Sequence, residues 1–172
     1  MIENFVDNYL EFMEFVDLLA RRFLIAVTAA MTLTIIVQVL FRYVLKNPLV
    51  WTEELARYLM IWMAFVGAGC IVKKWQNIYV DFFIDMLSSR RRQIAYFIQK
   101  LVVFVVLVYT LTLCLQVIPE VAGRQVMAAM GFNMMWAQSA LIAGLMLMAF
   151  QTLGILLHDL FKVRIFQNGS PR

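Results

Sequence analysis

The sequence predicts an all-α integral membrane protein with four transmembrane helices, and composition, apolar runs and charge placement all lead to this prediction. Of the 172 residues, 63% are hydrophobic and only 15% are charged, and the mean hydropathy is +0.80. A soluble globular domain is about half apolar and about a quarter charged. A water-soluble fold is therefore excluded, and we expect residues 1–172 to form a single membrane domain.

Four apolar segments are long enough to cross a membrane. A helix needs about 20 mostly apolar residues to span a hydrocarbon core of about 30 Å. The predicted spans are residues 23–45, 54–74, 94–118 and 132–158. The second apolar stretch is short, so this span must extend to Arg57 and Lys73 at its ends. The long side chains of these residues can reach the interface. Pro119 is expected to end the third span, because proline cannot donate the backbone hydrogen bond that continues a helix.

The placement of lysine and arginine predicts the orientation. Ten of these residues flank the two ends of the chain and the connection between the second and third spans, whereas four lie on the opposite side. Cytoplasmic loops are enriched in lysine and arginine, so both termini, including a tail at 159–172, are expected in the cytoplasm. The first 20 residues are acidic, unlike a signal peptide. A bacterial inner membrane is the expected location.

Two segments outside the spans have amphipathic patterns. In residues 1–22, acids recur at steps of three or four and form one stripe: Glu3, Asp7, Glu11, Glu14 and Asp17. Such a helix either lies in the membrane interface with its acids in water, or docks on a partner's basic surface. Residues 76–90 are expected to form an arm along the membrane plane or an ordinary interfacial connector.

The connection between the first two spans concentrates polar residues. Gln38 and Arg42 are four residues apart, so they share a helix face at the end of the first span. Asn47-Pro48 predicts a turn. Thr52 is then expected to be the N-cap of the next helix.

Carboxylates follow this expected cap. Glu53 and Glu54 fall in the first helical turn, where they favour the positive end of the helix dipole. Either of them can pair with Arg57. Ionisable groups at membrane depth suggest a functional site, so this cluster holds the hairpin together, contacts a partner, or binds a substrate or proton. With Trp51, the candidate contact residues are Gln38, Arg42, Trp51, Glu53, Glu54 and Arg57.

Small residues at helical spacing predict close packing between helices. They are Ala64, Gly67 and Ala68 in the second span, and Ala140 and Gly144 in the fourth. The alternative is that these residues face lipid incidentally.

The sequence lacks the residues that several kinds of functional site require. The single histidine excludes a bis-histidine haem site, and no glycine-rich phosphate loop, metal-ligand set or nucleophile–base pair is present. We therefore expect no enzyme activity, no cofactor and no metal. The net charge of +4 reflects membrane orientation rather than binding to nucleic acid.

One family shares the pattern of the hairpin. The pattern comprises Gln38, Phe41-Arg42-Tyr43-Val44, Pro48, Trp51, Glu53-Glu54, Arg57, Trp62, Gly67, Ile78, Val80 and Asp81. The sequence thus resembles the small membrane subunit (the DctQ-like or Q subunit) of tripartite ATP-independent periplasmic (TRAP) transporters. Members often carry a histidine just before the Ile-x-Val-Asp element, where this chain has Gln76-Asn77.

The resemblance implies a scaffold subunit of a sodium-driven importer of an organic acid, of the C4-dicarboxylate or sialic acid class. The implied partners are a large membrane subunit on a separate chain, a periplasmic solute-binding protein and membrane lipids. Two alternatives remain: an autonomous four-helix transporter acting as a homodimer, and a membrane anchor of a respiratory complex. The first would need a carboxylate within residues 23–41 and the second a pair of histidines, and the sequence has neither.

Overall fold

The computed structural model describes residues 2–73 and 89–168 and confirms four helices long and apolar enough to span a membrane. In chain order these helices are α1 (Ile2–Val39), α2 (Val50–Lys73), α4 (Ser89–Ala122) and α5 (Met135–Asn168). A π-helical turn, η1 (Leu40–Val44), continues α1. Most of the arm expected at 76–90 lies outside the described residues.

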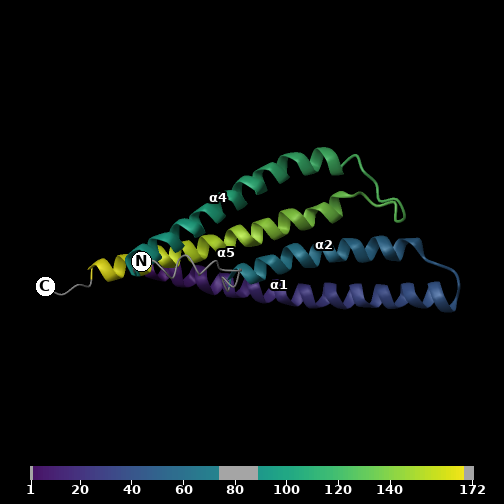
Figure 1. Cartoon of the computed structure of the whole chain (residues 1–172), viewed down its shortest axis with the longest axis horizontal. Helices are drawn as coiled ribbons and strands as arrows, with labels where there is room; N and C mark the ends of the chain where they lie inside the picture. The colour runs from purple at the N-terminus through teal and green to yellow at the C-terminus, as the bar shows by residue number, and fades with distance from the viewer. Residues whose placement is uncertain (1, 74–88, 169–172) are drawn as a thin grey trace.

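The four helices form a flat layer in the order α4, α5, α2, α1 (Figure 1). α5 packs between α4 and α2, and α1 packs mainly against α2. The start of α1 and the end of α5 lie at one end of the layer (Figure 1). The two described connections, residues 45–49 and 123–134, lie at the other, which we call the connection end. Long apolar faces of the outer helices α1 and α4 are therefore left uncovered by the other described residues.

α1 runs without a break through the boundary expected near residue 22. Its first turns pack on α5, where the Tyr9 hydroxyl donates a hydrogen bond of 2.8 Å to the carbonyl oxygen of Phe150. The Tyr9 ring also packs on that of Phe150, with centroids 5.0 Å apart. A Cβ added at Gly154 would lie 2.8 Å from the Met13 sulfur, so a larger residue there would displace the Met13 side chain. The position of these turns relative to the membrane surface stays a prediction.

The acidic stripe of α1 does not face water throughout. Glu11 and Glu14 are exposed, whereas Asp17 is buried. The Arg21 guanidinium Nε donates to the Asp17 carboxylate at 2.9 Å. Neither alternative for this stripe, acids in water or acids on a partner, describes Asp17, because α1 turns this position toward α2.

The expected end of the third span at Pro119 is also wrong. α4 continues to Ala122, with Pro119 inside its last turn. A proline there loses its backbone hydrogen bond to the preceding turn and its ring crowds the carbonyl group four residues earlier. The helix nevertheless continues for three more residues. A Cβ added at Gly123 would lie 2.6 Å from the Pro119 carbonyl oxygen, and the chain leaves the helix at this glycine.

Small residues allow α5 to approach α2 closely. Ala140 and Gly144 are buried, and a Cβ added at Gly144 would lie 2.6 Å from the Phe65 Cβ. The sequence did not single out Gly69, but a Cβ added there would lie 2.5 Å from Leu147 Cδ2 on α5. Gly67 and Ala68 are half-buried, and Ala64 is exposed.

Candidate functional site

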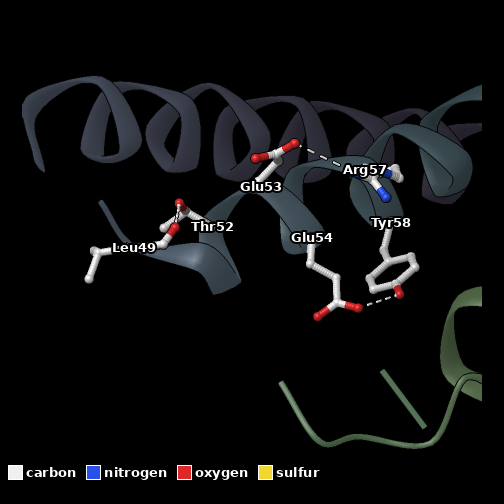
Figure 2. Close-up of polar contacts among 6 residues, drawn as sticks. All are labelled: Leu49, Thr52, Glu53, Glu54, Arg57 and Tyr58. Carbon is white, nitrogen blue, oxygen red and sulfur yellow. Dashed lines mark hydrogen bonds and ion pairs between the residues drawn. The ribbon is translucent and has the colours of Figure 1, made fainter. Parts of the chain in front are cut away.

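The Glu54 carboxylate joins α2 to the connection between α4 and α5. It accepts backbone N–H hydrogen bonds from Ala128 at 3.1 Å, Ala129 at 2.8 Å and Met130 at 3.1 Å. The Tyr58 hydroxyl, one turn along α2, donates a fourth at 2.8 Å (Figure 2). Hydrogen bonds to an ionised group are stronger than those between neutral groups. Glu54 is therefore a clamp on residues 128–130, and we call this arrangement the Glu54 clamp.

The connection folds so that its amides can reach this carboxylate. Met127 donates its N–H to the Phe132 carbonyl at 2.8 Å, and Gly131 donates to the Met127 carbonyl at 2.9 Å. Gly131 has a φ of 69°, a left-handed conformation that glycine adopts without strain. The N–H groups of three successive residues, 128–130, consequently converge on one anion, as in other backbone anion-binding turns.

A small apolar core lies beneath the clamp. Tyr58, Met127 and Ala137 are buried together, so α2, the connection and the start of α5 meet in one cluster. Ile118 at the end of α4 lines a neighbouring crevice of about 190 Å³ with Tyr58. The Tyr58 side chain therefore packs in the core with its ring and serves the clamp with its hydroxyl.

Glu53 and Arg57 form a separate ion pair on the outer side of α2. The Arg57 Nη2 lies 3.5 Å from the Glu53 Oε1, and each side chain is 62% exposed (Figure 2). Of the two pairings the sequence allowed, the structure thus contains the one with Glu53. Exposed pairs of this kind contribute about 0–1 kcal/mol to stability, so this one is a surface feature rather than a buried support.

Thr52 does not cap α2 as expected. The helix begins at Val50, so Thr52 already lies in its first turn. Its buried hydroxyl instead donates back to the Leu49 carbonyl at 2.7 Å (Figure 2). The prediction failed because α2 starts at Val50, two residues before Thr52, so the position that precedes the helix is occupied by Leu49.

The remaining candidates lie at the connection end and take no part in the clamp's hydrogen bonds. Arg42 is exposed in η1, and no described ion pair involves it. Trp51 is 41% exposed at the start of α2, and Gln38 is half-buried in the last turn of α1. The sequence did not point to residues 128–130. Gly123, Gly131 and Asn133 do mark a loop there, but no local pattern links it to Glu54.

Comparison with known proteins identifies the family of the chain. Residues 31–162 match the model of the family described as tripartite ATP-independent periplasmic transporters, DctQ component. This chain belongs to the DctQ family. The resemblance seen in the sequence is confirmed, and the matched segment contains both Glu54 and residues 128–130.

Individual relatives of this DctQ-family chain match over shorter segments. The Vibrio cholerae sialic acid TRAP transporter small permease protein SiaQ is 34% identical over 64 residues, 37% of each chain. The V. cholerae C4-dicarboxylate TRAP transporter small permease protein DctQ is 35% identical over 75 residues, 43% of this chain and 32% of the relative. The Haemophilus influenzae sialic acid TRAP transporter permease protein SiaT is 32% identical over 71 residues, 41% of this chain and 12% of the relative. The chain thus covers well under two thirds of each relative.

Proposed function

We propose that this DctQ-family chain is the small membrane subunit of a TRAP transporter that imports an organic acid of the sialic acid or C4-dicarboxylate class. The observation that carries the proposal is the family match over residues 31–162. The class of substrate is supported by the relatives, which are named for sialic acid and for C4-dicarboxylate transport. The chain has no catalytic role in this proposal.

Within the transporter, the chain acts as a scaffold for a large membrane subunit. A transport site near the middle of the bilayer requires polar or ionisable groups there. In the described spans the side chains of Asp, Glu, Lys and Arg lie toward the ends, and four of them form two ion pairs: Arg21 with Asp17, and Lys100 with Asp159. The flat layer leaves apolar faces on both outer helices, which suits a support that packs against another membrane protein. The sodium gradient then acts through the large subunit.

The connection end is the proposed docking surface for the periplasmic solute-binding protein. Trp51, Arg42 and the Glu53–Arg57 pair are exposed there, and the Glu54 clamp holds residues 128–130 beside them. A surface fixed before binding loses less conformational entropy when a partner docks. This assignment places the connection end in the periplasm of a bacterial inner membrane and both termini in the cytoplasm, as the lysine and arginine distribution favours.

Reconstitution tests the proposal. The chain, the large subunit and the binding protein encoded with it would be placed in liposomes under an inward sodium gradient, with labelled sialic acid or succinate outside. We expect uptake only when all three proteins are present. Sodium-dependent uptake by the chain alone would favour the autonomous transporter, and undiminished uptake without the chain would contradict the scaffold role.

A further inference from the structure

Methionine is concentrated in the connection between α4 and α5 and in the residue that follows it. Four of the twelve methionines lie within residues 127–135: Met127, Met130, Met134 and Met135. Residues 123–134 fall between two candidate membrane spans, so this connection lies outside the hydrocarbon core, where water-soluble reagents have access. Met135, at the start of α5, is 41% exposed.

The three methionines of the connection differ in how far they are shielded from water. Met127 is buried, with 3% of its surface exposed, whereas Met130 and Met134 are half-buried. Met130 and Met134 both pack against the apolar cluster beneath the Glu54 clamp, which Met127 forms with Tyr58 and Ala137. Each of these two side chains therefore contacts the cluster and remains partly open to water.

The backbone contacts of Met130 distinguish it from Met134. The Met130 N–H donates to the Glu54 carboxylate at 3.1 Å, and the Glu54 side chain points toward this connection (Figure 2). The Met134 N–H instead donates to the Gln125 carbonyl at 3.0 Å, and the Met134 carbonyl accepts two N–H groups at the start of α5, each at 3.1 Å. A displacement of Met130 therefore acts on the clamp directly, whereas Met134 is held by contacts that do not involve Glu54.

The thioether of methionine is open to oxidation by reagents that donate one oxygen atom, such as hydrogen peroxide. An S–O bond forms as the O–O bond breaks, the sulfur loses two electrons, and the peroxide leaves as water. The resulting sulfoxide makes a flexible apolar side chain polar. Because a polar group without a hydrogen-bond partner is costly to bury, we expect the Met130 sulfoxide to turn away from the cluster and into water.

We propose that Met130 is an oxidation site and that its sulfoxide opens the Glu54 clamp. As the side chain leaves the cluster, the Met130 N–H moves away from Glu54, and the turn that presents the N–H groups of residues 128 and 129 to the same carboxylate loosens with it. Methionine sulfoxide reductases reverse the modification, so the clamp closes again when the sulfoxide is reduced. The oxidation state of one sulfur thus decides whether the connection is held against α2.

Peroxide treatment of the purified chain in detergent tests the inference. Peptide mass spectrometry would measure the sulfoxide at each methionine, and hydrogen exchange would report on the amides of residues 128–130. We expect the sulfoxide to form at Met130 well before it forms at the buried Met127. Exchange at residues 128–130 should then accelerate by about tenfold or more, as for a segment that opens locally. Treatment with methionine sulfoxide reductases A and B should restore the protection.

Met130→Leu and Met134→Leu are matched variants, because each replaces a half-buried methionine of the same cluster with an apolar residue of similar size. After peroxide treatment the connection should stay protected in Met130→Leu and should open in Met134→Leu as it does in the unmodified chain. Both variants retain Cys70 and Cys114, so oxidation of these thiols does not distinguish them.

Three results would overturn the inference. They are the absence of sulfoxide at Met130, unchanged exchange at residues 128–130 when Met130 is fully oxidised, and opening of Met130→Leu to the same extent as the unmodified chain. The first two need only the unmodified chain, so the test holds even if a variant fails to fold. Every measurement uses this chain alone, so the outcome does not depend on the proposed function.

Discussion

Ala129 donates its backbone N–H to the Glu54 carboxylate at 2.8 Å, although 75 residues separate the two along the chain. With Ala128 and Met130 this contact ties the α4–α5 connection to the start of α2. A single side chain therefore holds this connection against the start of α2. A change at Glu54 should accordingly affect residues far from it in sequence.

Glu54→Gln should loosen the connection between α4 and α5. The glutamine side chain keeps one acceptor oxygen, but its NH₂ group replaces the other. Backbone N–H groups of residues 128–130 that faced the replaced oxygen then lose their acceptor. We expect hydrogen exchange at these amides to accelerate by about tenfold or more, as for a segment that opens locally. The measurement is exchange mass spectrometry in detergent, with Glu53→Gln as control. Equal protection in Glu54→Gln and the unmodified chain would show that the clamp does not hold the connection.

Gly144→Ala should weaken packing between α2 and α5. The new Cβ would lie 2.6 Å from the Phe65 Cβ and 2.7 Å from its backbone carbonyl oxygen, so a helix must shift. Overpacking of this kind costs about 1–3 kcal/mol, which thermal unfolding in detergent would detect. Gly67→Ala is the control, because its Cβ would meet only Leu24 Cδ2, at 4.0 Å. Equal stability of the two variants would contradict the close approach.

The ion pair between Lys100 and Asp159 should contribute more than the pair on the surface of α2. Lys100 of α4 and Asp159 of α5 keep only 14% and 31% of their side chains exposed. We expect Asp159→Asn to destabilise the chain by an amount between the about 0–1 kcal/mol of an exposed pair and the about 3–5 kcal/mol of a broken buried one. Thermal unfolding would measure the loss.

Two further variants give this prediction its controls. The charge-swapped double variant Lys100→Asp with Asp159→Lys should recover part of the lost stability. Glu53→Gln, which breaks the pair with Arg57 at 62% exposure, should change stability by about 1 kcal/mol or less. If Glu53→Gln lowered the stability more than Asp159→Asn, the pair between Lys100 and Asp159 would not be the stronger of the two.

Topology reporters should locate the connection end in the periplasm. Fusions after Asn47 and after Gly123 should give a periplasmic signal, and a fusion after Arg164 a cytoplasmic one. The reason is the excess of lysine and arginine at the end that holds the termini. Alkaline phosphatase and green fluorescent protein activities provide the two complementary readouts. A cytoplasmic signal at both connections would invert the proposed orientation and remove the docking role of Trp51 and Arg42.

Local physics accounts for what could be predicted. Apolar runs of about 20 residues predicted all four spans, because any helix that spans the hydrocarbon core must be mostly apolar. The exact ends were less predictable: Pro119 lies inside α4, and Thr52 lies inside α2. Helix ends depend on neighbouring segments as well as on the capping residue, so a local preference can be overridden.

The sequence by itself determined the class of the protein, the number of its spans and its family pattern, since each is written in composition or short spacing. Only the tertiary structure decided which partner each of the two neighbouring glutamates binds. Glu53 and Glu54 are adjacent and chemically alike, yet one forms an exposed pair with Arg57 and the other binds three amides of a distant connection. Successive residues on a helix point about 100° apart. The packing of α2 against α5 therefore determines which groups lie close to each of the two carboxylates.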